Sequence, residues 1–338
     1  MKKLTPTKIL VEVFFCVIMA ENFLGVIDLL KGRDLLSIHE LSVDEVHEVI
    51  EFAAELKAMQ KSGVPHHILE GKTLGMIFEK SSTRTRVSFE VGMFQLGGSA
   101  LFLSSRDLQL GRGEPIKDTA RVLSRYLDGI MIRTFGHERL VELAKYADIP
   151  IINGLTDLLH PCQVLTDLLT IREHKGKDFK GLKMAYVGDG NNMTNSYLYG
   201  AAKVGMNLAV ATPPNYKPNA EVFDNALSDA QESGAELSWT ENPVEAVKDA
   251  DIIATDTWAS MGQEAEHDER KKIFAPYQVN RELLKNASKN AIVLHCLPAY
   301  RGEEITDEVF ENNAHVIFDE AENRLHTQKA IMALTMAD

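Results

Sequence analysis

The sequence has little cysteine and no excess of positive charge. Its three cysteines, Cys16, Cys162 and Cys296, include no C-x-x-C pair. Such an odd, sparse set does not make a disulfide framework, so a reduced, cytoplasmic location is expected. Lysine and arginine number 36 against 49 acidic residues, a formal net charge of −13. This charge disfavours a nucleic acid or an anionic membrane as partner, although a local arginine cluster could still bind an anionic substrate.

Both glycine-rich nucleotide signatures are also absent. There is no Gly-x-x-x-x-Gly-Lys loop and no Gly-x-Gly-x-x-Gly fingerprint, and the segment 188–192 is only faintly similar to a dinucleotide-binding turn. A nucleotide-dependent dehydrogenase is therefore disfavoured.

Residues 1–30 allow several interpretations. Lys2 and Lys3 precede an apolar stretch over 9–20, which has the outline of a signal peptide. Glu12 interrupts that stretch, and Ile18 occupies the −3 position of a cleavage after Ala20. The stretch is also too short for a membrane-spanning helix. The sequence favours an N-terminal extension, or an upstream start codon with Met19 as the initiator.

What the chain does have, from about residue 42, is alternation of strand-like and helix-like segments. Strands are expected at 73–78, 100–103, 129–132 and 150–152, and again at 183–187, 208–211, 251–254 and 291–294. Helices are expected after a capping box at 42–45, at 87–96, 119–126 and 195–204, and from 320 onward. This pattern predicts an α/β fold with two domains, each a parallel sheet flanked by helices, joined by a helix near 162–174. The second domain is expected to be Rossmann-like, and 338 residues suffice for two domains that share a cleft.

The most specific motif is Ser-Ser-Thr-Arg-Thr-Arg at 81–86, between an expected strand and a helix. Hydroxyls and free N–H groups at a helix N-terminus can cradle a phosphate, and an arginine adds a forked donor. The alternative is a well-capped helix with solvated arginines.

Other polar residues follow expected strands, where parallel sheets bind ligands. His160 and Gln163 flank Pro161, and the imidazole could stabilise a developing oxyanion or simply pack at a domain junction. Arg133 directly follows a buried strand, which is unusual unless an anion or carboxylate lies nearby.

Further candidates lie in the second half. Asn191 and Asn192 suit a carboxylate or an amino-acid backbone, and Asp256 could bind a cationic amine. Asp256 begins a loop expected to reach about residue 273, long enough to form a lid. No metal-ligand spacing recurs, so no metal site is predicted. A Cys296–His295 catalytic pair is disfavoured because adjacent strand-end side chains point apart.

Taken together, Ser-Thr-Arg-Thr-Arg, His-Pro-x-Gln and His-Cys-Leu-Pro, in that order, resemble the aspartate/ornithine carbamoyltransferase superfamily. The resemblance extends from about residue 31 to the C-terminus, and Ser-Met-Gly at 260–262 with His-Cys-Leu-Pro points to its ornithine-specific branch. It implies a carbamoyl phosphate domain over 31–158 completed by a C-terminal helix over 320–338, and an ornithine domain over 159–319. It also implies a homotrimer or a multiple of trimers.

The resemblance implies roles for particular residues. The carbamoyl phosphate site would comprise Ser82, Thr83, Arg84, Thr85, Gln109, Arg133, His160, Gln163, Cys296, Leu297 and Arg324, with Gln109 reaching into a neighbouring subunit. Ornithine would be held by Asn192, Asp256, Ser260 and Met261. The catalytic residues would be Arg133, His160, Asp256, Cys296 and Arg324.

The implied reaction is attack of the neutral side-chain amine of ornithine on carbamoyl phosphate, giving citrulline and phosphate without a cofactor. Two alternatives stay open at this point. One is a carbamoyltransferase for another amine, putrescine or an N-acylated ornithine. The other is a non-catalytic small-molecule sensor of the same fold.

Overall fold

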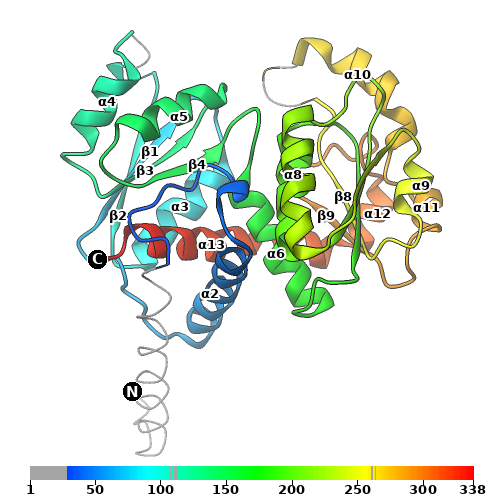
Figure 1. The fold of residues 1–338 in the computed structure, drawn as a ribbon, viewed down its shortest axis with the longest axis horizontal. Coiled ribbons are helices and arrows are strands. Elements are labelled where there is room, and N and C mark those ends of the chain that lie inside the picture. Colours follow the sequence, from blue (N-terminus) through cyan, green and yellow to red (C-terminus); the bar gives the residue numbers. More distant parts are fainter. Residues whose placement is uncertain (1–28, 107, 110–112, 260–261, 263) are drawn as a thin grey trace, which may run out of the picture.

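The computed structural model describes residues 29–338, except 107, 110–112, 260, 261 and 263. The predicted N-terminal extension therefore lies almost entirely outside the described residues. Two units lie side by side, each built on one sheet (Figure 1). Within the described ranges, no helix is long and apolar enough to cross a membrane.

The first unit contains a four-stranded parallel sheet of order β2-β1-β3-β4. Its strands are β1 Thr73–Phe78, β2 Ser99–Ser104, β3 Gly129–Arg133 and β4 Ile151–Leu155. Its helices are η1 Ile38–Glu40, α2 Val43–Ser62, α3 Thr83–Gln95, α4 Ile116–Leu123 and α5 His137–Tyr146.

The second unit contains a five-stranded parallel sheet of order β7-β6-β5-β8-β9. Its strands are β5 Lys183–Val187, β6 Asn207–Ala211, β7 Leu237–Thr240, β8 Ile252–Thr255 and β9 Ile292–His295. Its helices are α7 Asn192–Val204, α8 Ala220–Ser233, α9 Pro243–Val247, η3 Glu264–Glu266, α10 His267–Phe274, η4 Ala275–Tyr277, α11 Arg281–Leu284 and α12 Asp307–Asn312. The predicted α/β class, with helices flanking two parallel sheets, is confirmed.

Both faces of the first sheet are buried along β1 and β3, as is usual for parallel sheets, whereas the edge strand β2 is partly exposed. Met76 and Met131 pack toward α2, α3 and α13 (Ala314–Met336), whereas Ile77 and Ile130 pack toward α4 and α5. Residues adjacent in a strand thus fill opposite layers, because side chains alternate across a sheet.

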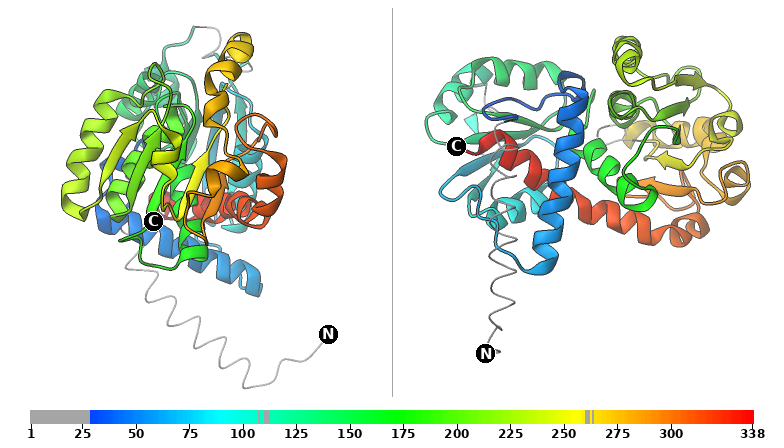
Figure 2. Two further views of the ribbon diagram at one scale, coloured as in Figure 1. Left: turned by 90° about the vertical axis from the view of Figure 1, so that its right-hand side faces the viewer. Right: turned by 60° about the horizontal axis from the view of Figure 1, so that its bottom comes forward.

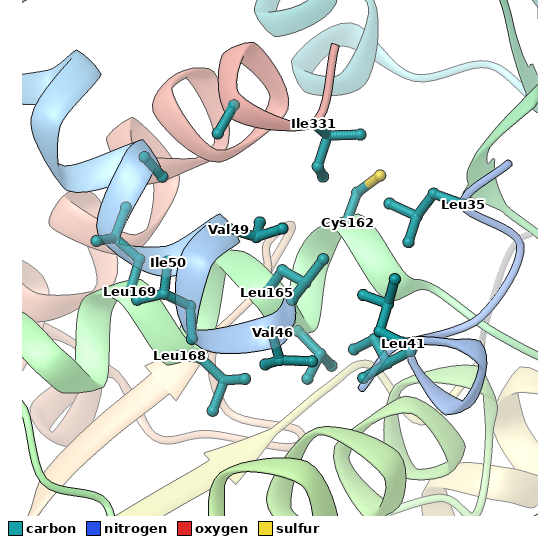
Figure 3. Packing of buried hydrophobic residues seen from close by; sticks show 14 of the residues in the cluster. Leu35, Leu41, Val46, Val49, Ile50, Cys162, Leu165, Leu168, Leu169 and Ile331 are labelled. Atoms are coloured by element: carbon teal, nitrogen blue, oxygen red, sulfur yellow. The ribbon is translucent and has the colours of Figure 1, made fainter. Parts of the chain in front are cut away.

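Helices α6 (Pro161–Lys175) and α13 tie the two units together. Helix α6 packs against α2, α7 and α13, and α13 crosses from the second unit to end beneath the first sheet (Figures 1 and 2). At this junction Val46 and Ile50 of α2 meet Leu165 and Leu169 of α6, with Ile331 of α13 nearby (Figure 3). The predicted capping box is present at the start of α2. The side chain of Ser42 accepts from the N–H of Glu45, and the side chain of Glu45 accepts from the N–H of Ser42.

Several expectations about the elements are wrong. The helices expected at 87–96 and 119–126 span Thr83–Gln95 and Ile116–Leu123, and strand β7 was not predicted. The last helix begins at Ala314 rather than Glu320. Its start was missed because Asn313, which also ends α12, makes no side-chain capping hydrogen bond. The segment after Asp256 is not one long loop, because α10 occupies His267–Phe274. That helix was missed because it is highly charged and buries only Arg270 and Phe274, too few apolar positions for a helical period.

Candidate active site

The carboxyl ends of both sheets face a shared cleft of about 1040 Å³. It is lined by predicted site residues from both units, which follow strands except for Arg324 of the last helix. These are Ser82, Thr83, Arg84, Thr85, Arg133, His160, Gln163, Asn192, Asp256, Cys296, Leu297 and Arg324. Segments more than 200 residues apart in sequence thus meet at one place, as expected for strand ends of parallel sheets.

The first wall of the cleft is the N-terminus of α3. Ser82 is its N-cap, and the Oγ of Ser82 accepts a hydrogen bond of 3.3 Å from the N–H of Thr85. The first turn contains no acidic residue, and Arg84 lines the cleft beside it. Free N–H groups, hydroxyls and a guanidinium together make a site for a phosphate-sized anion.

The floor of the cleft carries two buried arginines. Arg133 ends β3 and Arg324 lies on α13, and their exposed fractions are 8% and 4%. Burial, followed by the charge of Arg324, lowers the pKa of Arg133 to about 10. Burial also lowers the pKa of Arg324, to which the charge of Arg84 contributes. Cations that depress one another's pKa in a buried site favour an anion between them.

His160 is neutral in this environment. Burial, then Arg324 and Arg133, hold the pKa of its imidazole well below the usual value. Its backbone N–H donates to the Oγ of Ser196, and within the described structure its Nδ1 is buried without a hydrogen-bond partner. A neutral imidazole with an unused nitrogen can bind a polar substrate atom.

Arg324 is held in place by two hydrogen bonds. Its Nη1 donates to the Oε1 of Gln163, and its Nη2 donates to the Oγ1 of Thr85 at 3.1 Å. The guanidinium is therefore positioned by residues of α3 and α6 before any substrate binds.

Asp256 and Cys296 form the opposite end of the cleft. The Sγ of Cys296 donates to Oδ1 of Asp256 at 3.2 Å, and Nδ2 of Asn191 donates to Oδ2 at 3.0 Å. Burial, then the charge of Asp256, raise the pKa of the Cys296 thiol well above its usual value. Cys296 is thus a thiol and not a thiolate nucleophile. The imidazole of His295 contacts Glu304 and the N–H of Leu297 instead, so the two residues do not form a catalytic pair.

The turn after β5 approaches another loop closely. Gly190 donates its N–H to the carbonyl of Tyr216 at 2.9 Å, and a Cβ at Gly190 would lie 2.3 Å from that oxygen. The next residue, Asn191, caps α7 and contacts Asp256, whereas Nδ2 of Asn192 donates to the carbonyl of Thr156.

Several cleft residues were missed by the sequence analysis. Arg270 forms a buried ion pair with Asp189 and lies over the ring of Tyr216, fixing α10 against the turn after β5. Lys80 forms an ion pair with Asp157 and lies 4.4 Å from the ring centroid of Phe135. The only sequence signal for Lys80 was its position two residues after a strand.

Three predicted residues are not placed in this cleft. Gln109 lines a separate hollow with Leu108, Glu114 and Thr119. Ser260 and Met261 lie outside the described residues. Among the residues that the structure describes, no group of three metal-ligating side chains could hold a metal ion.

Comparison with known proteins adds independent findings. Residues 33–173 match the family model described as "Aspartate/ornithine carbamoyltransferase, carbamoyl-P binding domain". Residues 180–335 match that described as "Aspartate/ornithine carbamoyltransferase, Asp/Orn binding domain".

Relatives match over nearly their whole length. The chain is 60% identical over 306 residues to an ornithine carbamoyltransferase of Carboxydothermus hydrogenoformans, covering 90% of this chain and 98% of that one. The structure is similar to ornithine carbamoyltransferase from Pyrococcus furiosus, with a TM-score of 0.88, 55% identity and coverage of 91% and 98%. The anabolic ornithine carbamoyltransferase from Campylobacter jejuni matches with a TM-score of 0.84 and 46% identity, with coverage of 89% and 97%.

Proposed function

Since the chain belongs to the aspartate/ornithine carbamoyltransferase family, we propose that its cleft transfers a carbamoyl group from carbamoyl phosphate to the side-chain amine of L-ornithine. The products are L-citrulline and phosphate. The observation that carries the proposal is the placement of Arg84, Arg133 and Arg324 on one side of a cleft and Asp256 on the other.

The phosphate of the donor binds at the N-terminus of α3. Ser82, Thr83, Arg84 and Thr85 supply hydroxyl, backbone and guanidinium donors to it. These interactions hold the phosphate as it leaves with its negative charge.

The carbonyl oxygen of the donor faces Arg133, His160, Thr85 and Arg324. Attack by the amine turns this oxygen into an oxyanion, and fixed donors in a buried site stabilise it without reorganising. Because His160 is neutral, it serves as a hydrogen-bonding partner and not as an added positive charge.

Ornithine binds at the opposite end. Asp256 and Cys296 receive the amine, and Asn192 supplies an amide for the α-amino-acid head. Ser260 and Met261, which lie outside the described residues, are proposed to complete this site on the family resemblance. A free amine of this type has a pKa of about 10.4, so it must lose a proton before attack, and the bound phosphate is the proposed acceptor.

We further propose that residues 31–158, completed by 320–338, bind carbamoyl phosphate and that 159–319 bind ornithine. The two sheets and the two matched family models support this division. A homotrimer in the cytoplasm completes the proposal, with Gln109 contributing to a neighbouring subunit's cleft. Its position outside its own cleft supports that role.

The test is citrulline formation by the purified protein from carbamoyl phosphate and ornithine, with putrescine, aspartate and N-acetylornithine as parallel acceptors. We expect a strong preference for ornithine. Activity with another amine alone would retain the donor site and overturn the assignment of Asn192 and Asp256. Folded protein that is inactive with every acceptor would favour a non-catalytic sensor.

A further inference from the structure

Two carboxyl groups are buried directly behind the cleft. Asp167 of α6 and Glu320 of α13 are both fully buried, and both contact the side-chain amide of Gln163. The Nε2 of Gln163 donates to Oδ1 of Asp167 at 2.7 Å and to Oε1 of Glu320 at 3.2 Å. Neither acid touches the cleft itself.

The remaining carboxyl oxygens have their own donors. The hydroxyl of Tyr197 donates to Oδ2 of Asp167 at 2.6 Å, and the backbone N–H of His295 donates to Oε2 of Glu320 at 2.8 Å. Asp167 thus accepts two short hydrogen bonds, whereas the bond from Gln163 to Glu320 is longer. This asymmetry marks Asp167 as the carboxylate and Glu320 as the neutral acid of the pair.

The charges nearby agree with one shared proton. Arg324 is the cation beside the pair. One ionised carboxylate neutralises its positive charge, whereas two would leave a buried negative charge without a partner. Burial raises the pKa of Asp167 to about 6 and, together with the charge of Asp167, raises that of Glu320 well above its usual value. The other titratable groups facing the pair, Tyr197 of α7, Cys296 after β9 and Cys162 of α6, have raised pKa values and are neutral near pH 7.

This network determines which way the amide of Gln163 faces. Both of its N–H groups are used by Asp167 and Glu320, and its Oε1 accepts from Arg324. A flipped amide would place N–H groups against the guanidinium and the carbonyl oxygen against a carboxylate. The carbonyl oxygen of Gln163, with a second lone pair, is therefore the atom available at the cleft.

We propose that Asp167 and Glu320 are positioning residues that fix the carbonyl oxygen of Gln163 toward the cleft, where under the proposed function it accepts from the NH2 group of carbamoyl phosphate. The preference for an acyl phosphate bearing an NH2 group over one bearing a methyl group is the readout of this positioning. The inference rests on the proposed function, since it concerns the same donor site. Acetyl phosphate has the phosphate and carbonyl of carbamoyl phosphate but cannot donate to Gln163. A site built to accept a hydrogen bond rejects the analogue that lacks the donor.

The first experiment compares kcat/KM for carbamoyl phosphate and acetyl phosphate at saturating ornithine. Asp167→Asn replaces the carboxylate by a neutral amide whose NH2 group faces either Gln163 or Tyr197. The charge-assisted hydrogen bond that fixes Gln163 is lost, so the ratio of the two values should fall by about tenfold or more. Glu320→Gln keeps a neutral side chain but loses one acceptor, because its NH2 group must face the N–H of either Gln163 or His295. The shorter hydrogen bond from Gln163 to Asp167 is retained. We expect this variant to retain most of the ratio, within about threefold. Asp178→Asn, an exposed carboxyl beyond the end of α6, is the matched control.

A second measurement uses the unmodified protein, in case Asp167→Asn does not fold. It compares the dissociation constants of two inert analogues, phosphonoacetamide, which carries the NH2 group, and acetonylphosphonate, which carries a methyl group instead. Both have the same phosphonate, so its ionisation cancels in the ratio of the two constants. Because Asp167 has a pKa of about 6, the preference for the amide should weaken as the pH falls from 7 to 5.5.

Three outcomes separate the possibilities. If the unmodified protein forms no citrulline, the proposed function is wrong. An active protein whose Asp167→Asn variant keeps the ratio, or whose Glu320→Gln variant loses as much as Asp167→Asn, overturns the positioning role alone. A preference for phosphonoacetamide that is constant from pH 7 to 5.5 overturns it as well.

Discussion

Arg84 and Arg86 lie two residues apart and face different surroundings. Arg84 lines the cleft, whereas Arg86 is exposed, donates to Glu90 at 3.2 Å and lies over the ring of Phe102. The sequence motif contains both arginines but does not distinguish them. The distinction comes from the helix, where residues i and i+2 point to different sides.

We predict that Arg84→Ala lowers kcat/KM for carbamoyl phosphate by about 100-fold or more, because a charged donor to the leaving phosphate is lost. The melting temperature should change little, since Arg84 is not part of the core. Steady-state kinetics with varied carbamoyl phosphate measure the effect. Arg121→Ala, an exposed arginine on α4, is the control, and a near-normal Arg84→Ala would place the phosphate elsewhere.

Asn191 tests the amine end of the cleft. Asn191→Asp keeps an oxygen to cap α7 but replaces the N–H donor to Asp256 by a second carboxylate. We expect kcat/KM for ornithine to fall by about tenfold or more, with little loss of thermal stability. Asn219→Asp makes the same change at the N-cap of α8 and should leave kinetics normal. Equal effects of the two substitutions would contradict the role given to Asn191.

Sequence analysis identified Arg133, His160, Asp256 and Cys296 because each follows a strand. It missed the contacts that fix them, such as Asn191 with Asp256 and Arg270 with Asp189, which join residues 65 and 81 positions apart. No local pattern encodes such pairs, because they arise from the approach of neighbouring strand ends.

At the scale of elements, α13 combines structural and catalytic roles. It packs against α2, α3 and α6, carries Arg324 to the cleft and places Glu320 behind it, against Gln163. Lys329 of the same helix is fully buried, with Nζ 3.0 Å from Nε2 of His66. Burial lowers the pKa of Lys329 to about 8.

This buried lysine predicts a pH-dependent stability. Between pH 8 and about 10.4 the unfolded chain retains the Lys329 proton and the folded chain does not, so the free energy of unfolding contributed by this group rises with pH. Below pH 8 both states are protonated, and the penalty for the buried charge is constant. The buried thiols of Cys162 and Cys296, whose pKa values are raised, act in the opposite direction but equally in all variants. In urea unfolding from pH 7 to 9.5, the slope of the free energy of unfolding against pH should therefore be less positive for Lys329→Met than for the unmodified protein, whereas the exposed Lys272→Met should keep the original slope. Equal slopes in both variants would refute the prediction.

Element boundaries were predicted only in part, since α3 and α7 begin at Thr83 and Asn192 rather than at 87 and 195, although Ser82 and Asn191 cap them. Strands β1 and β5 match the expected ranges in full, because each is a short apolar run bounded by polar residues or glycine. The starts of α10 and α13 were missed, because neither helix has a side-chain cap. Helix α6 was predicted near 162–174, although its residues 161–171 are all buried and carry no amphipathic pattern.

At the scale of the whole molecule, the first unit leaves an apolar surface uncovered. Val87, Val91 and Phe94 of α3 and Leu101 and Phe102 of β2 are exposed, Phe94 by 78%, and β2 is an edge strand. Exposed apolar groups beside a sheet edge are typical of a subunit interface.

We predict that Phe94→Glu separates the proposed trimer into single chains and lowers activity with it, because Gln109 could no longer reach a neighbouring cleft. Light scattering during size-exclusion chromatography measures the mass. Val141→Glu, an exposed apolar position on α5, is the control. A Phe94→Glu protein of unchanged mass would move the interface to another face.

The late position of Arg324 in the chain has a consequence for biosynthesis. Both sheets are complete once β9 has been translated, yet the donor site still lacks the guanidinium and the acid that α13 supplies. A nascent chain on the ribosome can therefore form its sheets while remaining unable to react with carbamoyl phosphate. Competence arises in a single step near the end of translation, when α13 docks against α2, α3 and α6.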